Sequence, residues 1–280
     1  MSEEILKKVF NNICSEELEA LKPGNLNSFS GLHSMSKLKF KYAAKISSEY
    51  LISKNLSLGE GIYLSVKKCK TSLNSNYNLG IILLCAPLLK LSLMKKESLK
   101  SQLKKLLTRI SKKDGDLIIK SISHIKPAGL QNYSGNGNVL QSSQSLGFTK
   151  VMRIGSDWDR ISRCYIQNYN EIFEFGLPFF RSLSQKIPRL RAIELLFLNY
   201  LARDNDSHIQ RKFGAYKAKM ISKKSLFIQK SINYFKNNDA KLKKFDRYLK
   251  KFHYNPGTCA DLTVTTLLMD KIRDIFKIPL

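Results

Sequence analysis

The sequence predicts an all-α protein that forms a single globular bundle of about ten or eleven helices. Three observations lead to this fold class. Apolar residues recur at helical spacing over most of the chain, as in the run from Leu190 to Tyr200. The alternation of apolar and polar residues that is typical of strands is nearly absent. The 280 residues have a hydrophobic content of 43 %, which is enough to bury a sizeable core.

The first half of the chain is divided into helices by short polar turns. The N-terminal helix is amphipathic and ends at the Pro23-Gly24 turn. The segment 79–93 is the most apolar of the chain but is too short to cross a bilayer, so we expect a buried helix there. The helices expected in this half cover about residues 3–20, 35–54, 58–73, 78–93, 97–111 and 115–124.

The second half begins with the longest irregular segment, about residues 127–146, which is rich in Gly, Ser, Asn and Gln. This segment is either a loop within one domain or a linker between two. Similar helices lie on both sides of it, so we expect one domain covering residues 1–280. The helices expected in this half cover about residues 157–184, 189–203, 207–236, 239–251 and 257–276.

Composition limits the class of protein. A formal net charge of +26 indicates a surface that attracts phosphates, nucleic acid or acidic lipid, although the basic residues are spread along the chain. The N-terminus lacks the basic start of a secretory signal, and no membrane association is expected. The five cysteines lie far apart and form no CxxC pair, which fits a cytoplasmic protein without a disulfide framework or zinc site.

The first segment with functional chemistry follows Glu17 at the end of the N-terminal helix. Lys22 precedes a turn made by Pro23, Gly24 and Asn25. Such a turn exposes backbone N–H groups beside a lysine, which suits a phosphate, but it is also an ordinary helix stop. His33 follows as a candidate ligand or proton carrier, or as an exposed loop residue.

A second segment places Asn76, Asn78 and Gly80 at the start of the most apolar helix. The two amides can cap this helix or hold a nucleotide. Polar groups at the mouth of an apolar core need partners, which favours a binding site.

The third segment surrounds the start of the helix at residue 207. Asp206 precedes His208, Arg211 and Lys212, and Gly214 follows. As a structural motif, Asp206 caps the helix and pairs with Arg211. As a functional motif, the carboxylate holds Mg²⁺ while the two basic residues bind the phosphates that the metal bridges.

The fourth segment opens the last helix with a turn that contains Asn255, Gly257 and Thr258. The free N–H groups of a helix N-terminus favour an anion. Asp261 lies further inside, where it would face the core unless it met a metal or a base. A smaller cluster around Asp159 combines acids and arginines one turn apart, for which ion pairing is the simpler explanation.

No GxxxxGK[ST] loop, GxGxxG turn, GxSxG elbow or HExxH helix occurs in the sequence. In their order along nearly the whole chain, the segments resemble the triphosphoribosyl-dephospho-CoA synthase family. The stretches that carry the resemblance are Ala-Leu-Lys22-Pro-Gly-Asn25, Gly-Leu-His33-Ser-Met, Gly59-Glu-Gly-Ile62, Asn76-Tyr-Asn-Leu-Gly80 with Leu-Leu-Cys-Ala-Pro-Leu88, Pro127-Ala-Gly-Leu130, Asp159-Arg-Ile with Tyr165, Asp206-Ser-His-Ile-Gln-Arg-Lys-Phe-Gly214 and Asn255-Pro-Gly-Thr-Cys-Ala-Asp-Leu262.

The chain departs from the family pattern at three positions. Tyr77 stands where the family usually has threonine, Gln131 where it has a second glycine, and Asn138 where it has an aspartate. The forms of the first and third segments resemble a branch that also occurs in methylotrophic bacteria and archaea. This leaves open an acceptor other than dephospho-CoA.

The resemblance implies an enzyme that transfers the 5-triphosphoribosyl group of ATP to a 2′-hydroxyl of dephospho-CoA or a related acceptor and releases adenine. It implies Mg²⁺ with the ATP and no tightly bound cofactor. Asp206 and Asp261 are then expected to hold metal or stabilise the positive ribose, one of them acting as base. Lys22, Arg211 and Lys212 would bind the triphosphate, with ribose or base oriented by Asn76 and Asn78.

Three alternatives remain at this stage. The charge and the interspersed aromatic residues also fit a basic helical nucleic-acid-binding protein, although acids inside the basic motifs make this partner less suitable. A relative that binds a nucleotide without transferring ribose is a second alternative. A family member with another acceptor, in one-carbon cofactor biosynthesis, is a third. A homodimer is compatible with all of them.

Overall fold

The computed structural model describes residues 2–31, 36–93, 98–140, 146–236 and 239–276. Within these ranges it contains thirteen α-helices and no strand, which confirms the all-α prediction with more helices than expected. The helices are α1 (Glu3–Glu19), α2 (Lys37–Leu51), α3 (Leu58–Leu73), α4 (Leu79–Ser92), α5 (Leu99–Thr108), α6 (Lys112–Ile125), α7 (Phe148–Gly155), α8 (Arg160–Ile166), α9 (Leu177–Ser184), α10 (Arg189–Arg203), α11 (Ser207–Ser231), α12 (Asp239–Lys251) and α13 (Gly257–Phe276).

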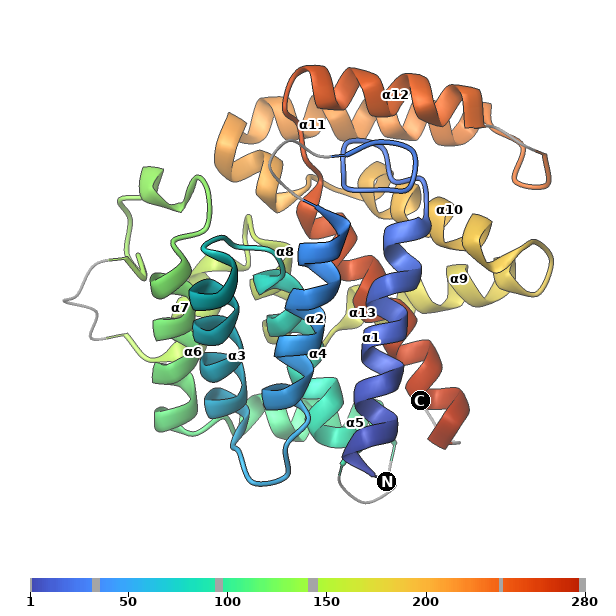
Figure 1. Cartoon of the computed structure of the whole chain (residues 1–280). Helices are drawn as coiled ribbons and strands as arrows, with labels where there is room; N and C mark the ends of the chain where they lie inside the picture. Colours follow the sequence, from blue (N-terminus) through green and yellow to red (C-terminus); the bar gives the residue numbers. More distant parts are fainter. Residues whose placement is uncertain (1, 32–35, 94–97, 141–145, 237–238, 277–280) are drawn as a thin grey trace.

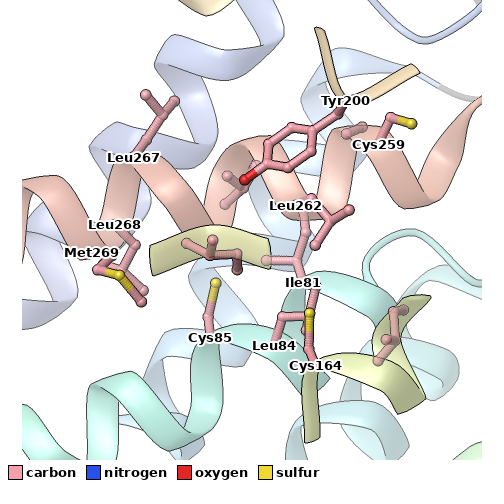
Figure 2. Close-up of a cluster of buried hydrophobic side chains, with 14 of the residues drawn as sticks. Ile81, Leu84, Cys85, Cys164, Tyr200, Cys259, Leu262, Leu267, Leu268 and Met269 are labelled. Atoms are coloured by element: carbon pink, nitrogen blue, oxygen red, sulfur yellow. The ribbon is translucent and has the colours of Figure 1, made fainter. Parts of the chain in front are cut away.

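Two helices, α4 and α13, form the centre of the molecule. Twelve of the 14 residues of α4 are buried, so this helix has no polar face. Helix α13 runs through the middle of the bundle and contacts α1, α4, α9 and α10 (Figure 1). Figure 2 shows apolar side chains of α4 and α13 in this shared core, with Tyr200 of α10 beside them. Because one cluster of buried apolar side chains includes members from all thirteen helices, we propose that the chain is one domain.

The other helices surround this centre in groups. Helices α2, α3 and α6 pack in sequence on one side, and α7 packs on α6. Helices α9 and α10 lie on the other side, while α11 and α12 lie across one end (Figure 1). The ammonium group of Lys224 in α11 lies 3.6 Å from the ring centroid of Tyr248 in α12, which ties these two helices together.

One predicted helix, 157–184, is in fact three elements: α8, a π-helix at Glu171–Gly176 and α9. The interruption lies at Asn168 and Tyr169, whose φ angles are 51° and 60°. Tyr169 is fully buried, and its hydroxyl donates to the carbonyl of Leu84 at 2.9 Å. This long-range contact holds the backbone in a conformation that a continuous helix excludes. The short helix α7 was not predicted.

A second correction concerns the predicted helix 207–236. Helix α11 ends at Ser231 and is interrupted at Gly214, where φ is 84° and ψ is 163°. The irregular segment 127–146 is described as far as Leu140 and contains a 3₁₀ turn at Leu130–Asn132. The kink lies three residues after Arg211 and the turn contains Leu130, and both of these residues line the cavity described below.

Two further observations concern the class of protein. In the described ranges, no helix combines the length and the apolar character that crossing a membrane requires. The five cysteines are buried free thiols.

Candidate active site

The N-termini of α4, α11 and α13 meet on one side of the core. Gly80 in the first turn of α4 lies against Asp261 of α13, and Asp206 touches the starts of both α11 and α13. The start of α8 joins them, because the N–H of Arg160 donates to the Ser207 hydroxyl at 2.8 Å. The starts of these helices therefore gather four of the sequence motifs in one place.

A cavity of about 120 Å³ opens between this meeting point and the loop that follows α6. Its polar end contains five residues that the sequence predicted: Asn76, Gly80, Asp159, Arg211 and Asp261. The rest of the lining is mainly apolar and consists of Leu79, Leu83, Ile122, Pro127, Leu130, Tyr133, Gly137, Val139, Val151, Met152, Ile154, Gly155, Trp158, Ile161 and Ser162.

Asp261 is the carboxylate of this site that lacks hydrogen-bonding partners. No described group donates a hydrogen bond to its side chain, which faces the cavity. A side chain on Gly80 would place its Cβ 2.0 Å from Asp261 Oδ2, so only glycine allows this approach. Burial raises the pKa of Asp261 well above its usual range, and the nearby carboxylates of Asp206 and Glu17 add to the rise while Arg211 opposes it. Asp261 therefore holds its proton to a higher pH than an exposed aspartate does.

Asp159 and Arg211 form an ion pair beside Asp261. Arg211 Nη1 lies 2.5 Å from Asp159 Oδ2, and the other oxygen of Asp159 accepts the N–H of Ser162 at 2.9 Å, which caps α8. Arg211 Nε is buried and has no hydrogen-bond partner in the described structure. A Cβ on Gly129 would lie 2.4 Å from the Arg211 carbonyl oxygen, so the loop after α6 packs directly on α11. The guanidinium thus has one donor that the described groups leave unpaired.

Asp206, the second predicted catalytic aspartate, lies beneath the site rather than in the cavity. Its side chain is fully buried, and its two oxygens accept the N–H groups of Ile209 at 3.0 Å and Cys259 at 2.9 Å. Burial raises the pKa of Asp206, and these two N–H groups oppose the rise. The carboxylate therefore caps α11 and joins it to α13.

Lys22 also lies away from the cavity. Its ammonium is 2.6 Å from Glu17 Oε1, and both side chains are at most 1 % exposed. Burial lowers the pKa of Lys22 and raises that of Glu17, while each partner opposes the other's shift. Asn25 donates to Asn255 Oδ1 at 2.7 Å and thereby joins this turn to the start of α13.

The turn is held in place by Asp246 of α12, a residue that the sequence analysis missed. Asp246 accepts hydrogen bonds from the Gly24 N–H at 2.9 Å, Asn27 Nδ2 at 3.1 Å and the Ser30 hydroxyl at 2.6 Å. Lys250 forms an ion pair with the same carboxylate at 3.1 Å. In sequence, Asp246 is one acid among many charged residues of an amphipathic helix, so no local signal marks it.

His208 faces the start of α13. A Cβ on Gly257 would lie 3.0 Å from His208 Nδ1, so the imidazole packs against this glycine. Burial lowers the pKa of His208 to about 3, and the positive charges of Arg211 and Lys212 contribute. The imidazole is therefore neutral at physiological pH. Lys212 is exposed at the surface on the same turn.

The remaining predicted residues have varied positions. Asn78 is 4 % exposed and donates to the Ser47 hydroxyl at 2.8 Å, away from the cavity. Thr258 is buried in the first turn of α13, and Gly214 forms the kink of α11. His33 lies outside the described residues.

Two departures from the family pattern also lie off the cavity wall. Tyr77 is buried in a small apolar cluster that includes Cys69. Asn138 donates to the Tyr133 carbonyl at 2.5 Å and accepts the N–H of Leu140 at 2.9 Å. Its amide therefore braces the loop internally, which an aspartate could do only in part because it has no donor.

The aromatic wall of the cavity was not predicted from the sequence. The rings of Trp158 and Tyr133 have centroids 5.7 Å apart and an interplanar angle of 36°. The available signal was the position of Trp158, the chain's sole tryptophan, next to Asp159. Tyr133 gave no signal, because the irregular segment that contains it shows no periodicity.

The arrangement supports acid–base chemistry on a ligand that is partly apolar and partly anionic. A carboxyl group with a raised pKa can donate or accept a proton near neutral pH. A guanidinium group beside helix N-termini favours phosphate oxygens. Among the described residues, no group of three His, Cys, Asp or Glu side chains is arranged to hold a metal ion.

Comparison with known proteins agrees with the resemblance seen in the sequence. The family model CitG, described as ATP:dephospho-CoA triphosphoribosyl transferase, matches residues 4–279. The fold is similar to a crystal structure of a "putative triphosphoribosyl-dephospho-coA synthase" from Archaeoglobus fulgidus, with a TM-score of 0.64 and 18 % identity. That match covers 82 % of this chain and 97 % of the other. The comparison with curated proteins gives no match.

Proposed function

Because the chain belongs to the family of ATP:dephospho-CoA triphosphoribosyl transferases, we propose that its reaction takes place at the polar end of the cavity, with Asp261 as the acid–base residue. The enzyme transfers the triphosphoribosyl group of ATP to dephospho-CoA. The single observation that carries the assignment of Asp261 is its carboxyl group, which faces the cavity and accepts no hydrogen bond from the described structure.

The reaction sets two requirements. The bond between C1′ of ATP and N9 of adenine breaks, and a bond forms between C1′ and the 2′-oxygen of the acceptor. The hydroxyl proton of the acceptor must leave, and the departing adenine must gain a proton. Positive charge develops on the ribose between these events, as in glycoside cleavage. One acid–base group beside C1′ can serve both proton transfers.

Asp261 meets both requirements in turn. Its raised pKa favours the neutral acid, which donates its proton to adenine as the C1′–N9 bond breaks. The resulting carboxylate stabilises the positive ribose and then accepts the proton of the attacking 2′-hydroxyl. This returns Asp261 to the neutral acid. Such proton transfer typically contributes about 10²- to 10⁴-fold to the rate.

We assign the triphosphate to the basic residues at the start of α11 and to the start of α13. Arg211 has a buried Nε without a partner, and Lys212 is exposed one residue later. The start of α13, at Asn255, Gly257 and Thr258, adds the positive end of a 20-residue helix. These groups bind phosphate oxygens without contacting the apolar end of the cavity.

Mg²⁺ fits the site only together with the triphosphate. Mg²⁺ is usually bound through one or two carboxylates and substrate phosphates, with several waters retained. Asp261 has free oxygens, whereas both oxygens of Asp159 and both oxygens of Asp206 already accept hydrogen bonds. Because Asp261 carries the transferred proton in this proposal, the triphosphate and water would supply the ligands of the ion, which would neutralise charge on the triphosphate.

Asp206, Glu17 and Lys22 then act as positioning residues. Asp206 fixes the start of α13, where Asp261 lies, and the Glu17–Lys22 pair anchors the turn that contacts Asn255. The negative charges of the two acids, Asp206 and Glu17, also help to raise the pKa of Asp261.

Two further assignments belong to the proposal. The buried free thiols fit a reducing compartment, so we assign the enzyme to the cytoplasm. We retain a homodimer as the expected state, to be tested by light scattering.

The test of the proposed function is release of adenine. ATP and dephospho-CoA are incubated with the wild-type enzyme, adenine is quantified by chromatography, and the joined product is identified by mass spectrometry. Asp261→Asn should reduce adenine release by about 10²- to 10⁴-fold. Asp157→Asn is a matched control, because Asp157 is exposed and does not line the cavity. An Asp261→Asn enzyme with the wild-type rate would exclude Asp261 as the acid–base residue.

A further inference from the structure

The apolar end of the cavity is a small core of its own. Leu130, Val139 and Val151 form a buried cluster that is separate from the main core, and Trp158 packs against it. Trp158 and Tyr133 present tilted rings to the same space. An apolar space lined by an indole suits a flat, uncharged ring, while phosphates would lose hydration there without gaining partners.

The volume of the cavity indicates which part of a nucleotide it can hold. Its volume is about 120 Å³. Sites that enclose drug-sized ligands typically reach at least roughly 300 Å³. A cavity of this size suits one base better than a whole nucleotide, which would extend from its open side. The triphosphate would extend past Arg211 at the polar end of the cavity towards the exposed Lys212.

The position of Asp261 decides between the two adenine rings of the substrates. Adenine of ATP is bonded to the reacting C1′, so its N9 must lie next to the acid–base residue. The acceptor reacts through its ribose hydroxyl, and its adenine is not attached at the bond that breaks. Asp261 lies at the border of the apolar end. The base that fits in the apolar end is therefore the adenine of ATP, which leaves in the reaction.

Asn76 supplies the polar contact that a base requires. Asn76 is an exposed residue at the edge of the cavity; its Oδ1 accepts the N–H of Leu79 at 3.2 Å, which leaves its Nδ2 open to solvent or to a ligand. An amide oxygen has two lone pairs, so Oδ1 can accept a second hydrogen bond. Asparagine pairs with adenine by donating to N7 and accepting from the 6-amino group. A donor at N7 also stabilises the base as it departs.

We propose that the apolar end of the cavity is the subsite for the leaving adenine of ATP, with Trp158 as the stacking surface and Asn76 as the residue that recognises the N6/N7 edge. This inference rests on the proposed function, since it takes the broken bond from that reaction. It adds the determinants of specificity for the donor nucleotide.

Trp158 is the only tryptophan, so its fluorescence reports on this subsite directly. ATP and free adenine should each change the emission of the wild-type enzyme in a saturable way, whereas inorganic triphosphate should not. Adenine should also inhibit turnover competitively with ATP. An emission change with dephospho-CoA but not with ATP would overturn the proposal, as would no change with any adenine compound.

Two substitutions test the contacts. Trp158→Leu keeps an apolar side chain but removes the stacking surface, and the KM for ATP should rise by about 5- to 150-fold. Trp158→Phe should restore part of this loss. Asn76→Asp keeps the acceptor that caps α4 but loses the amide donor, and should raise the KM for ATP by a similar factor. Asn74→Asp adds the same charge two residues away, off the cavity wall, and should leave this KM unchanged.

The KM for dephospho-CoA separates the subsites. It should stay within about twofold of the wild-type value in Trp158→Leu and Asn76→Asp. A rise in this KM without a rise in the KM for ATP would assign the cavity to the acceptor and overturn the proposal. Failure of the proposed function has a different signature: adenine would bind and change the emission, but ATP and dephospho-CoA would release none.

Discussion

Replacing Asp261 with asparagine should make the protein more stable while it removes activity. The carboxyl group is largely buried, accepts no hydrogen bond from the described residues, and lies near Asp206, Glu17 and Asp159. Only Arg211 opposes their repulsion. The amide has nearly the same shape and no charge, so it removes the cost of a buried carboxylate without leaving a cavity.

The magnitude follows from the pKa of Asp261 in the folded state. Because this pKa is raised, the wild-type protein loses stability as the pH rises from the ordinary pKa of an aspartate to the raised one. The loss amounts to about 1.4 kcal/mol for each pH unit in that window. The variant lacks this loss, so its advantage should grow with pH. Substitutions that relieve such strain typically add roughly 0.5–2 kcal/mol. For a chain of this size, each kcal/mol raises the Tm by about 2–4 °C.

The assay is thermal unfolding of the wild type and Asp261→Asn at pH 6 and pH 8, with adenine release measured on the same samples. Asp206→Asn is the matched control, since its carboxylate accepts the N–H groups of Ile209 and Cys259. The amide accepts only one of them, which should cost about 1–3 kcal/mol. The reasoning is refuted if Asp261→Asn melts below the wild type at pH 8, or if the two variants change stability in the same direction.

The remaining predictions concern the residues around Asp261. Arg211→Gln should raise the KM for ATP at least about tenfold, measured by adenine release, because the triphosphate loses a charged donor and Asp159 loses its partner. Asp246→Asn should lower the free energy of unfolding by about 1–3 kcal/mol in urea titrations, since the Gly24 N–H and its neighbours lose a charged acceptor. His208 should stay neutral in the folded state down to about pH 3, whereas the unfolded chain binds a proton there below about pH 6.5. Stability should therefore fall as the pH drops from about 6.5 to about 3. His208→Gln should flatten this part of the stability profile and leave the pH dependence of turnover unchanged.

The sequence predicted the central helices well because their signals are local. Helix α4 is apolar on every face, and α13 begins at Gly257, directly after Pro256. The interruption at Tyr169 could not be predicted, since it depends on a hydrogen bond to Leu84, 85 residues away. A periodicity analysis sees only that apolar residues continue at helical spacing through this segment.

The sequence indicated many of the residues that lie at or near the site, but it did not indicate the role of each. Asp206 and Asp261 are the same residue type near two helix starts, and only the fold distinguishes the carboxylate that caps two helices from the one that faces the cavity. Lys22 shows the same limit. Its partner Glu17 precedes it by five residues, but the sequence does not indicate that both side chains point inward.

The distribution of acids explains how one cluster of helix starts can serve two opposite charges. A helix N-terminus favours the triphosphate but would repel a ribose that becomes positive. Asp206 neutralises the starts of α11 and α13 from beneath, and Asp159 caps α8 while it pairs with Arg211. At the start of α4, the N–H of Leu79 donates to the side chain of Asn76, which brings no charge. Asp261 is thus the one carboxylate of this group without a fixed partner in the described structure, and its charge remains available for the ribose when the base departs.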